Sequence, residues 1–423
     1  MPTMVRVTRI RGFSFGSVRR ALVLVVILCG TPPARGTAAE IGHPNDFCAQ
    51  INALPPGGEV VLPPGEYRGP CTIRTSGLPG RPIVVRGQTP TQRPRIVYDG
   101  SRSNVIDVKA DHVTIRGLAF GPTQANIDGI RIFGREGVIV EECEFSGLGG
   151  IAIVANHHSS HGLVVRRNVV RNSDATAMYF GCHDGVDCVA EALLIEGNYI
   201  HTVRAPDPQI GYGIQVKLNS WGVVRDNVVV ATKGPGIMVY GAMNAEHASL
   251  IEGNLTADSL RSSGIVAGGG PVTIRNNIAT GNAVAGVGLE DYGRRGLLRG
   301  VIVVHNTLYG NDNGHFMVAR DGGVDATVVN NALHGKGTGA IAVPSVPGLR
   351  LGGNVNCSRV ACFVNPGDRD FSPLPGGPLI GAGVVPSEPW FPSFDFFGVR
   401  RMYPPSAGAV EIHGRPVRIG PKF

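Results

Sequence analysis

The apolar positions of the chain recur in one short pattern, an alternating strand followed by a turn and an Asn. Two earlier units carry Gly117 and Cys143 at the Asn position, and a second short strand, usually opened by Gly, follows the first, as in GIQV (213–216). Two short strands in each period of about 25 residues predict stacked coils rather than helix pairs or hairpins, so we expect an all-β solenoid of about ten coils. The units lie 23 to 30 residues apart and end at Asn168, Asn198, Asn227, Asn254, Asn277, Asn306, Asn331 and Asn354.

These eight Asn residues share one offset within the repeat. Stacked coils place them in register at an inward turn, where their amides can hydrogen-bond along the stack and satisfy backbone groups of the turn. We therefore predict a structural ladder, not a set of polar ligands.

Composition agrees with this pattern. The 423 residues include 61 Gly and 31 Pro, with 43% hydrophobic and only 6% aromatic residues, which suits short Val and Ile strands joined by tight turns. A solenoid of this length can form a single domain because each repeat contacts mainly its neighbours.

The first 39 residues predict an export signal cleaved after Ala39: six Arg without an acidic residue, an apolar run and a small-residue stretch. The run from Ala21 to Cys29 is shorter than the roughly 20 residues that span a bilayer. The net charge of +7 includes these six Arg, which leaves +1 for the mature chain. We therefore expect an exported monomer in the periplasm or outside the cell, with no nucleic-acid partner and no membrane insertion after signal removal.

Seven cysteines remain after the signal, and an exported protein can oxidise them. Spacing favours three pairs without proving them. A metal site of Cys182, His183 and Cys188 stays open, and we expect Cys143 to be a buried thiol. The favoured pairs are Cys48 with Cys71, Cys182 with Cys188, and Cys357 with Cys362.

Strand alternation assigns the faces of the second strands. The middle of the outward stripe carries Tyr179, Gln215, Lys217 and Tyr240, on coils about 4.8 Å apart. Such a groove over several coils predicts an extended polysaccharide as the ligand. Further outward or loop residues of this sheet are Arg131, His157, His158, His183, Asn244, Glu246 and Glu290. The residues after each Gly should point inward, namely Ile130, Ile151, Ile214, Ile237 and Ile265.

Residues 50–365 resemble the right-handed parallel β-helix repeat class. Residues 40–100 are similar to the N-terminal cap and first coils of exported β-helix polysaccharide-active proteins, 101–365 to their repeats, and 366–423 to a closing segment. The stretch YGIQVKLNS (212–220), with VVRDNVV and GPGIMVYG after it, resembles the lysine-bearing coil of polysaccharide lyases of this fold. The likeness is to the pectate lyases of family nine and, more loosely, to family six.

This resemblance implies that Lys217 removes the C5 proton of a uronic-acid residue, usually with Ca²⁺ on the substrate carboxylate. Such a base needs partial desolvation or a nearby positive group, for example His183 or His158. Tyr179 or Tyr240 would donate to the leaving oxygen, and Arg131 or Arg225, the latter on a first strand, would pair with carboxylates. We expect substrate contacts from Gln215, Arg131, His157, His158, Asn244, Glu246 and Glu290.

The chain departs from family nine at the metal site. That family carries a dense Asp cluster, whereas this chain offers only scattered carboxylates, of which Asp184 and Asp187 are the metal-ligand candidates. A metal-free mechanism with Tyr and His is equally open.

Other functions on the same fold remain as alternatives. A C5-epimerase would share the proton abstraction, but its DPH-type signature is missing. Hydrolysis needs two carboxylates about 5–10 Å apart, and Glu290, Asp291 and Glu246 form no convincing pair. A non-catalytic carbohydrate-binding solenoid would use Tyr179 and Tyr240 as stacking platforms.

Overall fold

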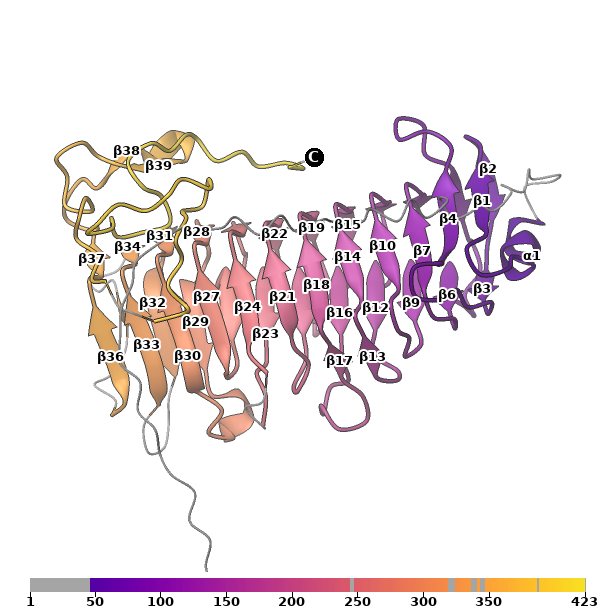
Figure 1. The fold of residues 1–423 in the computed structure, drawn as a ribbon, viewed down its shortest axis with the longest axis horizontal. Helices are drawn as coiled ribbons and strands as arrows, with labels where there is room; N and C mark the ends of the chain where they lie inside the picture. Colours follow the sequence, from indigo (N-terminus) through magenta and orange to yellow (C-terminus); the bar gives the residue numbers. More distant parts are fainter. Residues whose placement is uncertain are drawn as a thin grey trace, which may run out of the picture. The chain divides into compact units, whose positions relative to one another are not determined.

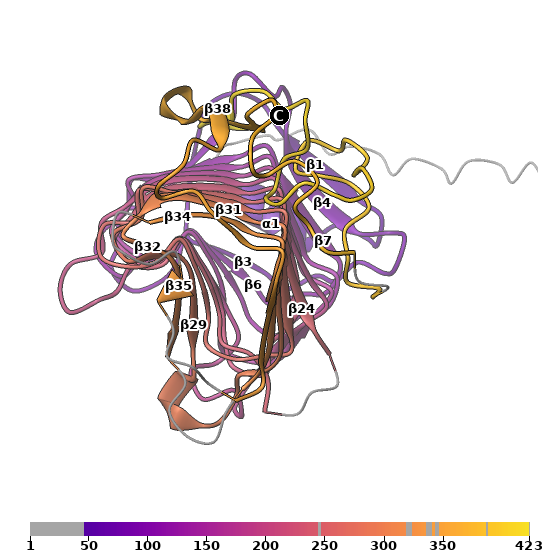
Figure 2. The ribbon, with the colours of Figure 1, turned by 90° about the vertical axis from the view of Figure 1, so that its left-hand side faces the viewer.

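Three parallel sheets form the walls of a solenoid in the computed structural model, which describes residues 46–243, 247–318, 324–335, 341–342, 347–385 and 388–422 (Figure 1). Within these residues the first two sheets have 12 strands each and the third has 11, and every neighbouring pair within them is parallel. Viewed along the solenoid, the sheets enclose an apolar core (Figure 2).

The strands alternate between the sheets in chain order. The first sheet holds β1 (Glu59–Leu62), β4 (Ile83–Gly87), β7 (Val113–Arg116), β10 (Ile139–Glu141), β14 (Val164–Arg166), β18 (Leu193–Glu196), β21 (Gly222–Arg225), β24 (Ser249–Glu252), β27 (Val272–Arg275), β30 (Arg299–Val304), β33 (Asp325–Val329) and β36 (Leu349–Gly352). The second holds β2 (Glu66–Arg68), β5 (Arg95–Val97), β8 (Ala119–Phe120), β11 (Glu144–Ser146), β15 (Val169–Ser173), β19 (Tyr199–Val203), β22 (Val228–Thr232), β25 (Leu255–Ala257), β28 (Ile278–Thr280), β31 (Thr307–Asn311), β34 (Ala332–Gly335) and β37 (Val355–Asn356). The third holds β3 (Cys71–Ile73), β6 (Ile106–Val108), β9 (Ile130–Ile132), β12 (Ile153–Ala155), β16 (Met178–Phe180), β20 (Ile214–Val216), β23 (Ile237–Val239), β26 (Ile265–Ala267), β29 (Ala285–Glu290), β32 (Asn313–Val318) and β35 (Ile341–Ala342).

Short elements complete the fold outside these sheets. They are the helix α1 (Phe47–Asn52), the pairs β13 (Ser160–His161) with β17 (Ala190–Glu191) and β38 (Phe363–Asn365) with β39 (Asp370–Pro373), and the 3-10 turns η2 (Tyr292–Arg294) and η3 (Pro366–Asp368).

The sequence pattern predicts two strands per coil, and this is wrong, because each complete coil has three. The strand of the second sheet begins directly after the Asn turn, as β19 does after Asn198. In the sequence it therefore reads as part of one apolar run. The inward assignment of Ile151 is also wrong: Ile153 pairs with Ile130 and Met178, while Ile151 lies half-buried before the strand.

The predicted Asn ladder is confirmed. Asn198 donates its Nδ2–H to Asn227 Oδ1 at 2.9 Å and to the Val165 carbonyl at 2.9 Å, and its backbone N–H reaches the same Oδ1. The bonds between neighbouring Asn side chains continue from Asn168 to Asn354. These side chains satisfy buried turn backbone, so they are structural.

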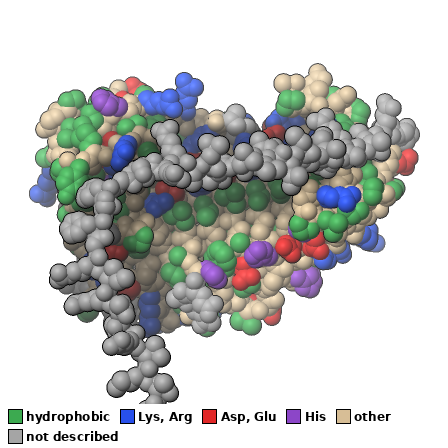
Figure 3. Space-filling model, in the orientation of Figure 1, with side chains coloured by type: hydrophobic (Ala, Val, Ile, Leu, Met, Phe, Trp, Pro, Cys, Tyr) green, Lys and Arg blue, Asp and Glu red, His purple; other side chains and the backbone are tan. Residues whose placement is uncertain are grey.

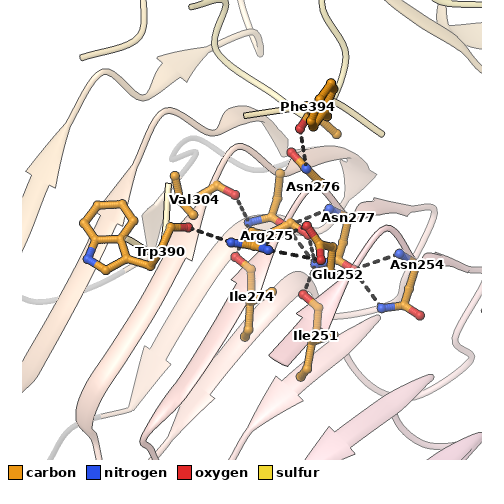
Figure 4. A network of polar contacts seen from close by, with 12 residues as sticks. Ile251, Glu252, Asn254, Ile274, Arg275, Asn276, Asn277, Val304, Trp390 and Phe394 are labelled. Carbon is orange, nitrogen blue, oxygen red and sulfur yellow. Dashed lines mark hydrogen bonds and ion pairs between the residues drawn. The ribbon is translucent and has the colours of Figure 1, made fainter. Parts of the chain in front are cut away.

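A row of alternating charges lies on the first sheet, where Glu196, Arg225, Glu252 and Arg275 occupy consecutive strands. The C-terminal segment binds the end of this row. Arg275 donates to the Trp390 carbonyl at 3.1 Å while it pairs with Glu252, and Asn276 donates to the Phe394 carbonyl at 2.8 Å (Figure 4).

Three disulfides join the predicted pairs, Cys48–Cys71, Cys182–Cys188 and Cys357–Cys362, and Cys143 is a buried thiol. The alternative metal site of Cys182, His183 and Cys188 is wrong because its two thiols are joined. Disulfides are typical of proteins that fold in an oxidising compartment. The export signal predicted for residues 1–39 lies outside the described residues. The described part of the chain contains no helix with the length and hydropathy of a membrane span.

Candidate functional site

Two outward rows of the third sheet build the candidate site. Tyr179, Gln215 and Met238 are register partners on β16, β20 and β23. Lys217 and Tyr240 follow two residues later and occupy the next outward row, because Lys217 N–H bonds to Phe180 O and Tyr240 N–H to Val216 O. Figure 3 shows a different face of the molecule, that of the first sheet, where histidine and acidic side chains gather on the lower half.

Lys217 is the central residue of these rows and is only 1% exposed. Its Nζ lies 3.8 Å from the centroid of the Tyr240 ring, 5.6 Å from that of Tyr179 and 6.0 Å from that of Tyr292. Burial lowers the pKa of the amine from 10.5 to about 8. The rings attract the ammonium form but provide no counter-ion, so a substantial neutral fraction exists near neutral pH.

A loop closed by the Cys182–Cys188 disulfide brings His183 to Lys217, with 3.2 Å between Nδ1 and Nζ. Asp184 Oδ1 accepts the N–H groups of Val186 and Asp187, and these bonds lower the pKa of Asp184. Asn219 donates to the Gly185 carbonyl at 2.8 Å. The loop is thus fixed at several points.

Tyr240 and Tyr179 differ in what their hydroxyls contact. Gln215 Nε2 donates to Tyr240 Oη at 3.0 Å, and Tyr212 Oη lies 3.0 Å from the same oxygen. Tyr240 is 4% exposed, whereas Tyr179 is half-buried. The hydroxyl of Tyr179 has no hydrogen-bond partner among the described residues. Burial raises the pKa of Tyr179 to about 12, so it holds its proton at neutral pH.

One groove of about 580 Å³ is lined by Tyr179, His183, Gln215, Lys217 and Tyr240 together with other residues. Residues 208–212 contribute to its lining, and Lys233 anchors the segment that carries them, since its Nζ contacts Asp207 at 2.6 Å and donates to the Ala205 carbonyl at 2.9 Å. The lining side chains with polar groups are Asn126, Asp128, Arg131, Thr176, Tyr179, His183, Gln209, Tyr212, Gln215, Lys217, Tyr240 and Tyr292.

Arg131 lies in this groove but is already paired. It contacts Asp128 at 2.5 Å and donates to Asn156 Oδ1 at 2.9 Å. Burial raises the pKa of Asp128, and the neighbouring guanidinium opposes that shift. Arg131 stands three strands before Gln215 in the row, so it cannot reach a sugar bound at Lys217.

Other predicted site residues do not line the groove. His157 and His158 are exposed and stack on each other, with centroids 4.9 Å apart. Glu290 is half-buried in the row of Lys217, and burial raises its pKa. Asn244 and Glu246 lie outside the described residues.

The metal candidates do not fit a calcium site. Ca²⁺ takes six to eight oxygen ligands, and no group of three or more His, Cys, Asp or Glu side chains within the described ranges is placed to hold an ion. Asp184 uses an oxygen to accept backbone N–H groups. Among the described residues Asp128 is the one carboxylate that lines the groove, and it is paired with Arg131.

The sequence predicts six of the twelve described polar residues that line the groove as site residues and misses the other six: Asn126, Asp128, Thr176, Gln209, Tyr212 and Tyr292. Tyr212 opens the lysine-bearing stretch, which was a usable signal. Asp128 and Tyr292 lie just outside strands, where alternation assigns no face.

Comparison with known proteins agrees with the architecture. A family model described as "Right handed beta helix region" matches residues 95–255. The chain is a right-handed parallel β-helix. No match was found among curated protein sequences.

Several solved structures are similar to this chain. The PL6 family polysaccharide lyase Pedsa3628 from Pseudopedobacter saltans has a TM-score of 0.50 and 14% identity, over 74% of this chain and 83% of its own. Pectate lyase Pel9A gives 0.49 and 17%, over 87% and 91%. The A-module of the mannuronan C-5 epimerase AlgE4 from Azotobacter vinelandii gives 0.39 and 18%, over 70% and 72%.

Proposed function

We propose that this β-helix is an exported polysaccharide lyase that cleaves a uronic-acid-containing polysaccharide by β-elimination, with Lys217 as the base. The observation that carries the proposal is a buried lysine with a lowered pKa that lines an open groove. General bases work best when their pKa lies near the operating pH. A polysaccharide lyase of the same fold supports a polysaccharide as the substrate.

The neutral amine of Lys217 would remove the C5 proton. A neutral amine has two N–H donors and a lone pair, so donating to His183 Nδ1 at 3.2 Å leaves the lone pair for the substrate. Once protonated, Lys217 stabilises the negative charge that develops on the sugar carboxylate. His183 would hold the amine in this orientation and contact the same carboxylate.

The leaving oxygen would take its proton from Tyr179. The C5–H electrons form the C4=C5 double bond, the C4–O bond breaks, and the oxygen accepts the phenol proton. Tyr179 is preferred to Tyr240 because its hydroxyl is unengaged among the described residues, whereas Tyr240 contacts Gln215 and Tyr212. Tyr240 would instead support Lys217 through its ring.

Hydrolysis receives less support from the same groove. A glycosidase needs two carboxylic groups flanking the bond, and the described lining contains only Asp128, in a pair with Arg131. Glu290 and Asp291 do not line the groove.

The test incubates the mature protein with a panel of uronate polymers and follows the ultraviolet absorbance of the unsaturated product, with and without EDTA. We expect a rise with at least one polymer, and no loss in EDTA because the described residues supply no calcium donor cluster. Incorporation of solvent deuterium at C5 without unsaturated product would contradict the lyase and indicate an epimerase. Binding without either reaction would indicate a carbohydrate-binding solenoid.

A further inference from the structure

The groove extends from Lys217 over several coils toward the N-terminus and ends just beyond Lys217 in the other direction. Its floor includes Arg131 on β9, Tyr179 on β16 and Gln215 on β20, and ends with Tyr240 after β23. The next residues of the outward rows, Val266 and Gly268, do not line it.

The segment 291–297, which carries η2, forms the closed end. Met238 and Val266 face outward in the row of Gln215, yet they are only 4% and 1% exposed because they pack in a cluster with Tyr240 and Leu297. Tyr292 packs on this cluster. The segment therefore covers the sheet at Met238 and Val266, and neither residue lines the groove.

Two contacts hold Tyr292 at this position. Its backbone N–H bonds to the Gly268 carbonyl at 2.9 Å, and its ring meets that of Tyr240 edge-on, with centroids 4.5 Å apart at 89°. A Cβ on Gly268 would lie 3.1 Å from the Tyr292 Cβ, so the segment lies directly on the sheet.

The distances on the two sides of Lys217 are unequal. The centroid of Tyr292 is 6.0 Å from Lys217 Nζ. In the other direction, three strand steps separate Gln215 from Arg131, which is about 14 Å at the usual strand spacing. A polysaccharide therefore has room for several residues on one side and for a short end on the other.

From this asymmetry we infer that the protein binds the end of a polysaccharide chain and acts exolytically, releasing mono- or disaccharides, with Tyr292 as the residue that stops the chain. The exolytic cleavage in this inference rests on the proposed lyase function. The binding of a chain end is independent of that function. Tyr292 is a specificity-determining residue here, not a catalytic one.

The first experiment follows product size and viscosity together on the long polymer that gives the highest rate. The wild type should release small unsaturated products from the first minutes while viscosity falls slowly. Tyr292→Ala should yield longer oligosaccharides and a faster fall in viscosity. Tyr403→Ala, which removes an 84% exposed tyrosine of the C-terminal segment, is the matched control and should behave as wild type. A ladder of long unsaturated oligosaccharides from the wild type at early times would overturn the inference and leave the lyase proposal intact.

The second experiment needs no catalysis. Oligosaccharides that carry a bulky fluorophore at one end or the other are tested for binding to Lys217→Met. One of the two labels should abolish binding and the other should be tolerated. If both labelled forms bind like the unlabelled chain, the inference that the groove is closed at Tyr292 is wrong. If the labels discriminate but the wild type makes no unsaturated product, the lyase proposal fails while the end-binding groove stands.

Discussion

Lys217 lies with its Nζ 3.8 Å above the ring of Tyr240, on the neighbouring strand position of the same outward row. The ring covers the amine from solvent and attracts its cation, while Tyr240 uses its hydroxyl to contact Gln215 and Tyr212. The arrangement separates two tasks: Tyr240 supports the base, and Tyr179 remains available as an acid.

The rate should rise with pH and reach a plateau above about 8, the pKa of Lys217. The neutral amine is the base, so about a tenth of the molecules are active at pH 7, against about one in three thousand for a lysine of pKa 10.5. The measurement is kcat/KM between pH 5 and 10. A rate that falls as pH rises through 8 would contradict the assignment of Lys217 as the base.

Lys217→Met should stabilise the protein while it abolishes the reaction. Burial lowers the pKa of Lys217 in the folded state from 10.5 to about 8, so the charged amine destabilises the fold below pH 8. This destabilisation by the charged amine disappears as the pH rises toward 10.5. We expect a gain of about 1–3 kcal/mol in the free energy of unfolding at pH 7, measured by urea denaturation at pH 7 and pH 10. A loss of stability at pH 7 would show that the amine forms stabilising contacts.

Tyr179→Phe and Tyr240→Phe separate the two tyrosines. Loss of the acid should lower kcat about 10²–10⁴-fold. Loss of the Tyr240 hydroxyl removes neutral hydrogen bonds but keeps the ring, which should lower kcat by about tenfold or less. Steady-state kinetics on both variants provide the comparison, and a larger effect at Tyr240 would reverse the two roles.

The Cys182–Cys188 loop should couple folding to activity through His183. Replacing both cysteines with Ser opens a loop of sequence separation 6 and should lower stability by about 2 kcal/mol. It should also lower kcat, because the loop places His183 at Lys217. The control is the double Ser variant of Cys357 and Cys362, with a sequence separation of 5, which should lose similar stability at unchanged kcat. Equal kcat in both variants would show that His183 does not contribute to the reaction.

The sequence predicts the parts of this molecule that repeat. The Asn ladder, the outward row with Gln215 and the cysteine pairs all follow from a fixed offset or a short spacing. Lys217 was placed beside Tyr240 for the same reason, since parallel stacking brings equivalent positions of neighbouring coils together.

The sequence does not predict what interrupts the repeat. Residues 208–212 and Tyr292 belong to insertions between strands, whose course depends on contacts such as Lys233 with Asp207 and Tyr292 with Gly268. The third strand of each coil was missed because the Asn turn is too short to separate two apolar runs. The pairing of Arg131 with Asp128 was also missed, and it changes Arg131 from a free cation into a paired one.

The central claim is tested most directly by the ultraviolet absorbance of the C4=C5 product with wild type, Lys217→Met, Lys217→Arg and Lys109→Met on the best uronate polymer. Lys109 is exposed at the same outward position four coils earlier, and serves as the control. We predict that wild type and Lys109→Met form product at similar kcat. Both Lys217 variants should form none, because methionine has no basic group and arginine stays protonated. Product formation by Lys217→Met at the wild-type rate would contradict the account.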